Sequence, residues 1–312
     1  MTRLIALLTC FVISLSASAQ RDTNNVYLFS YFKGNGEDGL HLAYSYDGYT
    51  FTALNNDKSF LHPVISQDKL MRDPCIIRGA DGNFHLVWTV SWNAKGIGYA
   101  SSPDLVHWSE QQYIPVMETE DSARNCWAPE ITYDPKSKQY MIYWATTIAG
   151  KYASETGVEK GYNHRIYYTT TKNFKSFGKT NLLYEKSFNV IDASIVADGN
   201  KFIMFLKDET PAPPQKNIRI ATSDRLTTGF SKPSLPITGP YWAEGPTAIK
   251  IKNQWIVYFD KYMNHQYGAV TSTDMLNWTD ISDKIKMPAG IRHGTIFTMT
   301  KQELAVLLKQ FP

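Results

Sequence analysis

Five ionisable side chains open five similar apolar segments of the chain, at intervals of about 50 to 65 residues. Four are carboxylic acids and the fifth is a histidine: Asp73, Glu130, Asp192, Glu244 and His293. Neighbouring carboxyl groups raise one another's pKa, so a cluster can hold a protonated acid beside an ionised base. If the fold brings the five segment starts together, the cluster is suited to general acid–base chemistry.

A simpler explanation applies to each position alone. Asp and Glu before proline or glycine often serve only to form a turn, as Asp73-Pro74 and Glu244-Gly245 could. That explanation is weak for the whole set, because all five positions are ionisable while the residues after them are apolar. We therefore interpret the set as functional.

The elements that would position these residues repeat at the same interval. Each unit has an aromatic and β-branched run, and the five runs cover residues 26–32, 84–90, 139–145, 202–208 and 255–261. A turn motif follows in each unit: Ser45-Tyr46-Asp47, Ser102-Pro103-Asp104, Thr171-Lys172-Asn173, Thr222-Ser223-Asp224 and Ser272-Thr273-Asp274. With a fourth outer strand after each turn, the pattern predicts an all-β, five-bladed β-propeller.

The order of the copies predicts how the ring closes. The first unit lacks an opening strand, whereas the opening strand at 293–298 has no followers. We expect this strand to pair with 26–32, so that N- and C-terminal strands complete one blade. Thr300 and Glu303 then form a capping-box pattern, with apolar residues at helical spacing behind it. This predicts a short C-terminal helix over 301–311.

In a propeller the innermost strands run in the same direction along the central channel. The opening strands are the innermost ones here, so their starts should meet at one mouth of that channel. The two cysteines outside the N-terminal segment, Cys75 and Cys126, do not form a disulfide framework, and whether they pair stays open.

The N-terminal segment is typical of an export signal. Arg3 precedes an apolar run over 4–15, and Ala17-Ser18-Ala19 offers a cleavage site. We expect a signal peptide at 1–19, a single catalytic domain at 20–312, and a periplasmic or secreted protein. Lipidation at Cys10 is less favoured. The remaining chain has no segment long enough to span a membrane, and its net charge of +3 is not clustered as nucleic-acid binding requires.

Taken in order, the motifs resemble those of glycoside hydrolase family 43. The matching elements are Arg72-Asp73-Pro74, Trp127-Ala128-Pro129-Glu130, Ile191-Asp192, Glu244-Gly245-Pro246 and His293-Gly294-Thr295. The third blade has Asp-Ala where the family more often has Asp-Pro. The resemblance implies an inverting hydrolase in which Asp73 is the general base, Glu244 the general acid, and Asp192 the residue that orients the acid and keeps it protonated.

The resemblance also implies substrate contacts near the mouth. We expect them from Glu130, Trp127, Trp242, Trp92 and Arg292. His293 is a candidate ligand, through water, of calcium or another cation in the channel, and no cofactor is needed for the chemistry.

The expected substrate is an oligosaccharide or polysaccharide, with a terminal α-L-arabinofuranosyl residue as the first choice. A β-xylosidase, a β-galactofuranosidase and a carbohydrate-binding propeller without activity are the alternatives. The sequence leaves the linkage, exo or endo action and the oligomeric state open.

Overall fold

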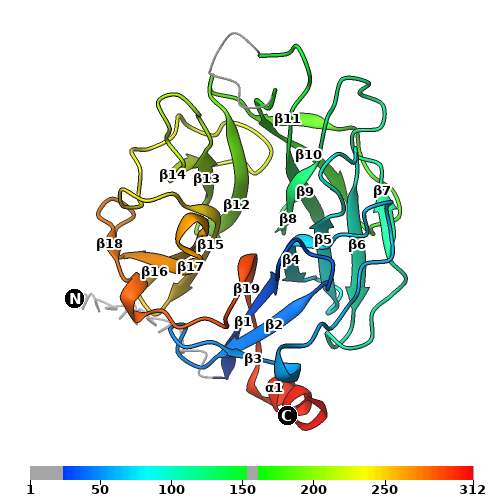
Figure 1. Ribbon diagram of the computed structural model, residues 1–312, viewed down its shortest axis with the longest axis vertical. Coiled ribbons are helices and arrows are strands. Elements are labelled where there is room, and N and C mark those ends of the chain that lie inside the picture. The colour runs from blue at the N-terminus through cyan, green and yellow to red at the C-terminus, as the bar shows by residue number, and fades with distance from the viewer. Residues whose placement is uncertain (1–23, 153–160, 312) are drawn as a thin grey trace, which may run out of the picture.

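The computed structural model describes residues 24–152 and 161–311 of the chain. Its strands form five sheets arranged around one axis (Figure 1), which confirms the predicted five-bladed propeller. The expected signal peptide at 1–19 lies outside the described residues. Within them, no helix is both long and apolar enough to cross a membrane.

The blades follow one another along the chain. Blade 1 consists of β19 (Arg292–Thr300), β1 (Asn25–Phe32), β2 (His41–Ser45) and β3 (Thr52–Ala53). Blade 2 consists of β4 (Arg72–Arg78), β5 (Phe84–Thr89), β6 (Ile97–Ser102) and β7 (Gln112–Ile114). Blade 3 consists of β8 (Trp127–Asp134), β9 (Gln139–Thr146), β10 (Arg165–Thr171) and β11 (Asn181–Tyr184).

The other two blades complete the ring. Blade 4 consists of β12 (Val190–Asp198), β13 (Lys201–Asp208) and β14 (Asn217–Ser223). Blade 5 consists of β15 (Glu244–Ile251), β16 (Gln254–Lys261), β17 (Gln266–Ser272) and β18 (Thr279–Asp280). Short 3₁₀ turns lie between strands, at η1 (Asn55–Asp57), η2 (Tyr262–Asn264) and η3 (Ser282–Lys284).

Apolar side chains pack between neighbouring blades. Blades 1 and 2, for example, bury Leu28 and Phe297 against Trp88, and blades 4 and 5 bury Phe205 against Val257. The described core consists of five such clusters, one at each contact between blades. This packing holds the innermost strands β4, β8, β12, β15 and β19 beside the axis.

The repeated turn motif works through its side chains. In blade 1, Ser45 Oγ accepts a hydrogen bond from the Gly48 amide at 2.9 Å, and Asp47 Oδ1 accepts from the amides of Tyr49 and Thr50. The same arrangement recurs at Ser102 and Ser272 in blades 2 and 5. These bonds satisfy the turn amides at the end of a strand, which explains why the motif marks each unit.

Blade 4 departs from the prediction of four strands, because the described part of this blade has three. The segment after β14 does run beside it, with the Ser234 and Ile237 amides donating to carbonyls of Ile220 and Ile218. Pro233 and Pro236 interrupt this segment. Proline has no N–H to donate, so a regular ladder cannot form there.

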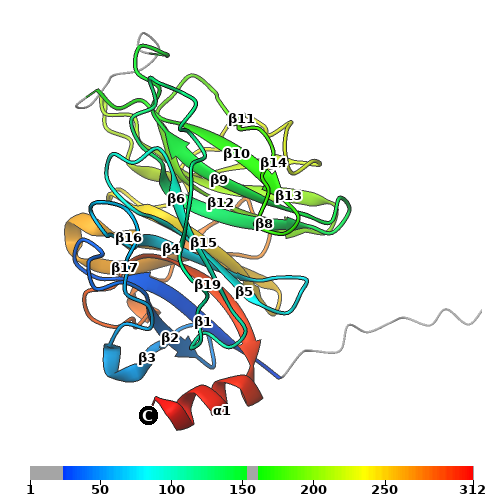
Figure 2. The same ribbon diagram turned by 90° about the vertical axis from the view of Figure 1, so that its right-hand side faces the viewer.

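The two ends of the chain close the ring, as predicted. β1 pairs antiparallel with β19 over a register that joins Asn25 to Thr300. The helix α1 (Lys301–Gln310) follows directly and lies outside the propeller (Figure 2). Its predicted capping box is present, since Thr300 Oγ1 accepts from the Glu303 amide and Glu303 Oε2 accepts from the Thr300 amide.

Candidate active site

A β-bulge interrupts the beginning of every innermost strand. The pairing with the second strand shifts between Arg72 and Cys75 in β4, and β8, β12 and β15 shift at the same point. In β19 the irregularity falls between Arg292 and Thr295. The residue just after the point where the pairing begins to shift has a positive φ in four of these strands, of 52° at Asp73, 46° at Ala128, 52° at Asp192 and 59° at Gly245. Such backbone costs free energy at the three residues that are not glycine, which is typical of functional sites.

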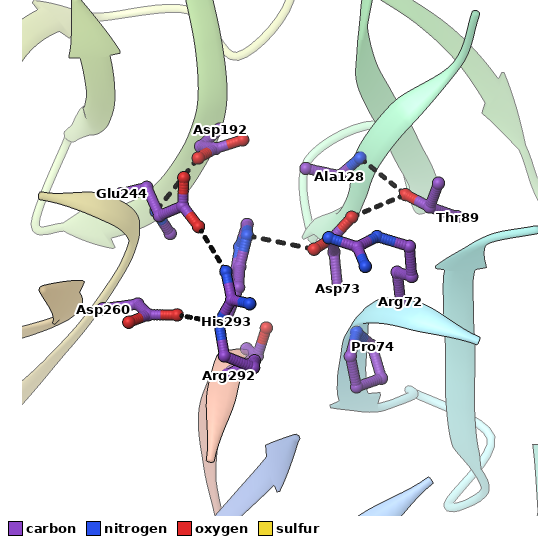
Figure 3. Close-up of polar contacts among 12 residues, drawn as sticks. Arg72, Asp73, Pro74, Thr89, Ala128, Asp192, Glu244, Asp260, Arg292 and His293 are labelled. Atoms are coloured by element: carbon purple, nitrogen blue, oxygen red, sulfur yellow. Dashed lines mark hydrogen bonds and ion pairs between the residues drawn. The ribbon is translucent and has the colours of Figure 1, made fainter. Parts of the chain in front are cut away.

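The bulges set equivalent positions in the five blades. Asp73, Asp192 and His293 occupy this position just after the start of the shift, as Ala128 and Gly245 do in the other two blades, and Glu244 precedes it by one residue. Figure 3 shows Asp73 and Glu244 on opposite sides of His293. The structure thus brings three predicted acids and the histidine together at one mouth.

The Asp73 side chain is 11% exposed and is held as a carboxylate. His293 Nδ1 lies 3.3 Å from Asp73 Oδ1, and Thr89 donates a hydrogen bond to Asp73 Oδ2 at 2.8 Å. The Thr89 hydroxyl in turn accepts from the Ala128 amide at 2.8 Å. Burial acts to raise the pKa of Asp73, but the hydrogen bond and charge of His293 outweigh it and lower the pKa to about 2. An ionised, oriented carboxylate is what a general base requires.

Glu244 contacts two cations. Lys207 Nζ donates to Glu244 Oε2 at 3.1 Å, and Arg292 Nη2 donates to Oε1 at 3.0 Å (Figure 3 shows the Arg292 bond). Burial acts to raise the pKa of Glu244, but the charges of Lys207, His293 and Arg292 outweigh it, so the pKa is lowered. Without substrate, Glu244 is therefore a carboxylate at neutral pH.

Asp192 retains its proton to a higher pH than Glu244 does. Burial is the main reason that its pKa is raised to about 6, and the negative charges of Glu244 and Asp73 add to it. Asp192 Oδ2 accepts a hydrogen bond from the Gly245 amide at 3.0 Å, next to Glu244. We expected Asp192 to keep Glu244 protonated. In the substrate-free site, the charges of Lys207 and Arg292 instead keep Glu244 ionised, and Asp192 is the acid that holds its proton to the higher pH.

Three residues of this network were not predicted from the sequence. Lys207 is the last residue but one of β13, Thr89 is the last residue of β5, and Asp260, near the end of β16, accepts a hydrogen bond from Arg292 Nε at 2.7 Å. All are in second strands, whose ends reach the same mouth as the starts of the innermost strands. The signal was charge at the end of an apolar run, as in Lys207-Asp208-Glu209 and Asp260-Lys261.

Glu130 lies deeper in the channel than the other acids. It is two residues further along its strand than Ala128, the position equivalent to Asp73. Ser194 and Thr295 donate to its two oxygens at 3.3 and 3.1 Å, and it is 6% exposed. Burial raises its pKa to about 7. The structure places Glu130 among protein hydrogen bonds rather than beside its predicted partners at the mouth.

The predicted tryptophans form two separate groups. Trp92 and Trp127 are in edge-to-face contact, with ring centroids 5.5 Å apart, and the Arg72 guanidinium lies 4.2 Å from the centre of Trp92. Trp242 packs near Tyr262, with ring centroids 6.0 Å apart. Trp92 and Trp242 are each about two-fifths exposed, at 41% and 39%. Exposed indole faces are suited to stacking on sugar rings.

His293 carries its own positive charge. Burial acts to lower its pKa, but the carboxylates of Asp192, Asp73 and Glu244 outweigh it and raise the pKa to about 9. Among residues 24–152 and 161–311, no three His, Cys, Asp or Glu side chains converge as direct ligands of a metal ion. A protonated imidazole has no free lone pair for a metal ion, so in this charge state His293 could contact a cation only through water.

Both described cysteines are free and buried. Cys75 packs among apolar residues between blades 2 and 3. The bulge also brings its thiol into a hydrogen bond with Glu130. Burial raises the pKa of Cys75 far above its usual range, which makes it a poor nucleophile.

Comparison with solved structures shows the same fold. The chain is similar to an α-L-arabinofuranosidase from Lactobacillus brevis, with 19% identity and a TM-score of 0.53, over 67% of this chain and 72% of that one. A thermostable family-43 glycoside hydrolase gives 15% identity and a TM-score of 0.55, over 72% and 78%. An enzyme of Xanthomonas citri, solved with xylotriose, gives 12% identity and a TM-score of 0.55, over 70% of this chain and 75% of that one.

The sequence itself points to the same family. No curated protein matches it. A family profile described as "Probable glycosyl hydrolase domain", of the group related to glycoside hydrolase family 43, matches residues 22–305. This range includes all five blades and every residue of the acidic mouth. The chain therefore belongs to the glycosyl hydrolase family related to glycoside hydrolase family 43.

Proposed function

We propose that this chain hydrolyses a terminal glycosidic bond with inversion at the anomeric carbon. The observation that supports this most is the pair of carboxylates on opposite sides of His293: Asp73, held ionised, and Glu244, whose side chain is 20% exposed. An inverting glycosidase needs a base on one face of the sugar and an acid on the other.

The bond changes then follow directly. Asp73 removes a proton from a water molecule while the water oxygen bonds to the anomeric carbon. The glycosidic C–O bond breaks, and the leaving oxygen takes a proton from Glu244. His293 and Thr89 keep Asp73 oriented toward the water through the contacts given above.

Glu244 must gain a proton before it can donate one. Both of its oxygens accept hydrogen bonds from cations, so one partner has to move away. Arg292 is the one able to do so, because its side chain is 31% exposed and retains Asp260 as a partner, whereas that of Lys207 is 3% exposed. We infer that a sugar bound at the mouth displaces Arg292, and that activity is highest at mildly acidic pH.

For the substrate we propose an α-L-arabinofuranosyl residue at the end of an oligosaccharide or polysaccharide. The similarity to the Lactobacillus brevis arabinofuranosidase supports this choice. The Xanthomonas citri enzyme was solved with xylotriose, and another similar structure is named a β-1,3-galactosidase, so xylosyl and galactosyl residues are the competing candidates. The exposed Trp92 and Trp242 are suited to stacking on any of these rings.

We also propose that the protein is exported after removal of 1–19, and that no metal takes part in the reaction. The charge of His293 already provides a cation beside Asp73. Exhaustive chelation should therefore leave kcat and the thermal midpoint unchanged. Recovery of lost activity by calcium would contradict this.

One experiment tests the main proposal. The purified chain is given arabinofuranosyl, xylopyranosyl and galactosyl oligosaccharides, and the first sugar released is followed by proton NMR. We expect release from the arabinofuranosyl substrate, with the anomer opposite to that of the substrate. Retention of configuration would overturn the inverting mechanism, and binding without release of sugar would identify a carbohydrate-binding propeller.

A further inference from the structure

Lys207 is a buried lysine whose ammonium group lies between two acids. Its side chain is 3% exposed, and Nζ is 3.1 Å from Glu244 Oε2 and 2.7 Å from Glu209 Oε2. The ammonium group also lies 4.6 Å from the centre of the Tyr262 ring. A lysine is almost never buried without such partners, because removing its charge from water costs several kcal/mol.

Lys207 is not part of the core on which the blades depend. It lies one residue before the end of β13, at the mouth, and follows the apolar residues Phe202–Leu206, which pack against blades 3 and 5. Its contacts are to Glu244, Glu209 and Tyr262, so what it fixes is the position of the Glu244 carboxylate. Glu209 in turn contacts Lys216, 2.5 Å away.

The charged groups around Glu244 come from four strands. Asp192 comes from β12, Lys207 from β13, Asp260 from β16, and Arg292 and His293 from β19. Glu209 and Tyr262 also contact the Lys207 ammonium group. Arg292 is partly exposed and shares its charge with Asp260, so Lys207 is the cation that stays beside Glu244 when a substrate occupies the mouth.

We propose that Lys207 is a positioning residue of this active site, which holds the Glu244 carboxyl group in place and limits the pH range over which that group carries a proton. Glu209 opposes this effect by competing for the same ammonium group. The inference rests on the proposed role of Glu244 as the general acid.

The test compares the pH dependence of kcat/KM on a natural oligosaccharide in three variants. Lys207→Met removes a cation that stabilises the ionised form of Glu244. The alkaline limb of the profile, where the acid loses its proton, should therefore move up by about one pH unit. Glu209→Gln leaves Lys207 free to act on Glu244 alone, so the limb should move down. Lys207→Arg, which retains the charge, should leave the limb near its wild-type position.

Lys261→Met is the matched control. Lys261 ends β16 in the neighbouring blade, and its ammonium group lies 4.1 Å from the centre of the Tyr241 ring rather than beside Glu244. This variant should leave the alkaline limb unchanged.

The opposite signs separate positioning from a structural role, since a loss of stability would lower the rate without moving the limb in two directions. Unchanged limbs in Lys207→Met and Glu209→Gln, or shifts of the same sign, would overturn the inference. If Lys207→Met does not fold, an unmoved limb in Glu209→Gln is sufficient to overturn it. A Glu244→Ala variant that is equally impaired on good and poor leaving groups would instead overturn the proposed function.

Discussion

The imidazole Nδ1 of His293 lies 3.3 Å from a carboxylate oxygen of Asp73, and each residue is the second of an innermost strand in a different blade. This contact joins blade 1, where the ring closes, to blade 2, which carries the proposed base. It also couples the ionisation of the two groups, because the pKa of Asp73 is lowered to about 2 while that of His293 is raised to about 9.

The first prediction concerns stability against pH. The folded-state pKa of His293 is raised from 6.5, so its contribution is complete below pH 6.5 and is lost as pH rises to about 9. Asp73 is the opposite case, since its contribution is present above pH 3.8 and is lost as pH falls to about 2. The free energy of unfolding should thus fall by roughly 3 kcal/mol between pH 6.5 and 9 because of His293.

Denaturant unfolding across this pH range measures the effect. His293→Gln keeps polarity without the titration, so its stability should change much less between pH 6.5 and 9 than that of the wild type. Parallel curves for the two proteins would contradict the assignment of the charge to His293.

The second prediction separates the base from the residue that orients it. Asp73→Asn removes activation of the attacking water and should lower kcat by roughly 10²–10⁴-fold on every substrate. Thr89→Val removes only the hydrogen bonds to Asp73 and the Ala128 amide, so its loss should be smaller, on the order of 10-fold. Steady-state kinetics on one oligosaccharide and one aryl glycoside check both. An Asp73→Asn enzyme as active as Thr89→Val would show that Asp73 is not the base.

The third prediction concerns the leaving group. Glu244→Ala should lose roughly 10²–10⁴-fold on natural oligosaccharides, whose leaving oxygen needs a proton. It should lose far less on aryl glycosides with acidic phenols, which depart without one. The slope of log kcat/KM against phenol pKa measures this dependence, and it should be steeper in Glu244→Ala than in the wild type. An equal loss on all leaving groups would contradict the acid role.

The fourth prediction tests the closure of the ring. A Cβ added at Gly294 would lie 1.8 Å from the Ser30 carbonyl oxygen, in the neighbouring strand β1. Gly294→Ala should therefore push β19 away from β1 and lower the free energy of unfolding by about 3 kcal/mol. Thr298→Ala, on the same strand at a partly exposed position, is the control and should cost less than about 1 kcal/mol. Equal thermal midpoints for the two variants would contradict the pairing at this point.

The sequence was sufficient for the fold because the repeat is local. Each unit carries its own apolar runs and a turn whose side chains bond to its own amides, as Ser45 and Asp47 do. The closure of β1 on β19 also followed from the order of the copies. The fourth strand of blade 4 was predicted wrongly, because the spacing of the turns does not reveal the effect of Pro233 and Pro236.

The candidate site was predictable only where residues belong to the opening motifs. The depth of Glu130 could not be predicted, because a bulge adds a residue to the strand and moves Glu130 past the mouth. Lys207 and Asp260 were missed since they come from second strands. The lowered pKa of Glu244 depends on Lys207 in β13 together with His293 and Arg292 in β19, which no single segment of sequence contains.

The pairing of β1 with β19 has a consequence for how the chain folds during its synthesis. A ribosome delivers β1 and Asp73 early, but Arg292 and His293 only with the final strand. Contacts between such distant segments form slowly, because a long loop must close before they gain any free energy. Until β19 has been synthesised, Asp73 therefore lacks its contact with His293, and Glu244 lacks its contact with Arg292. The active site can therefore form only after all five blades, β19 included, have been synthesised.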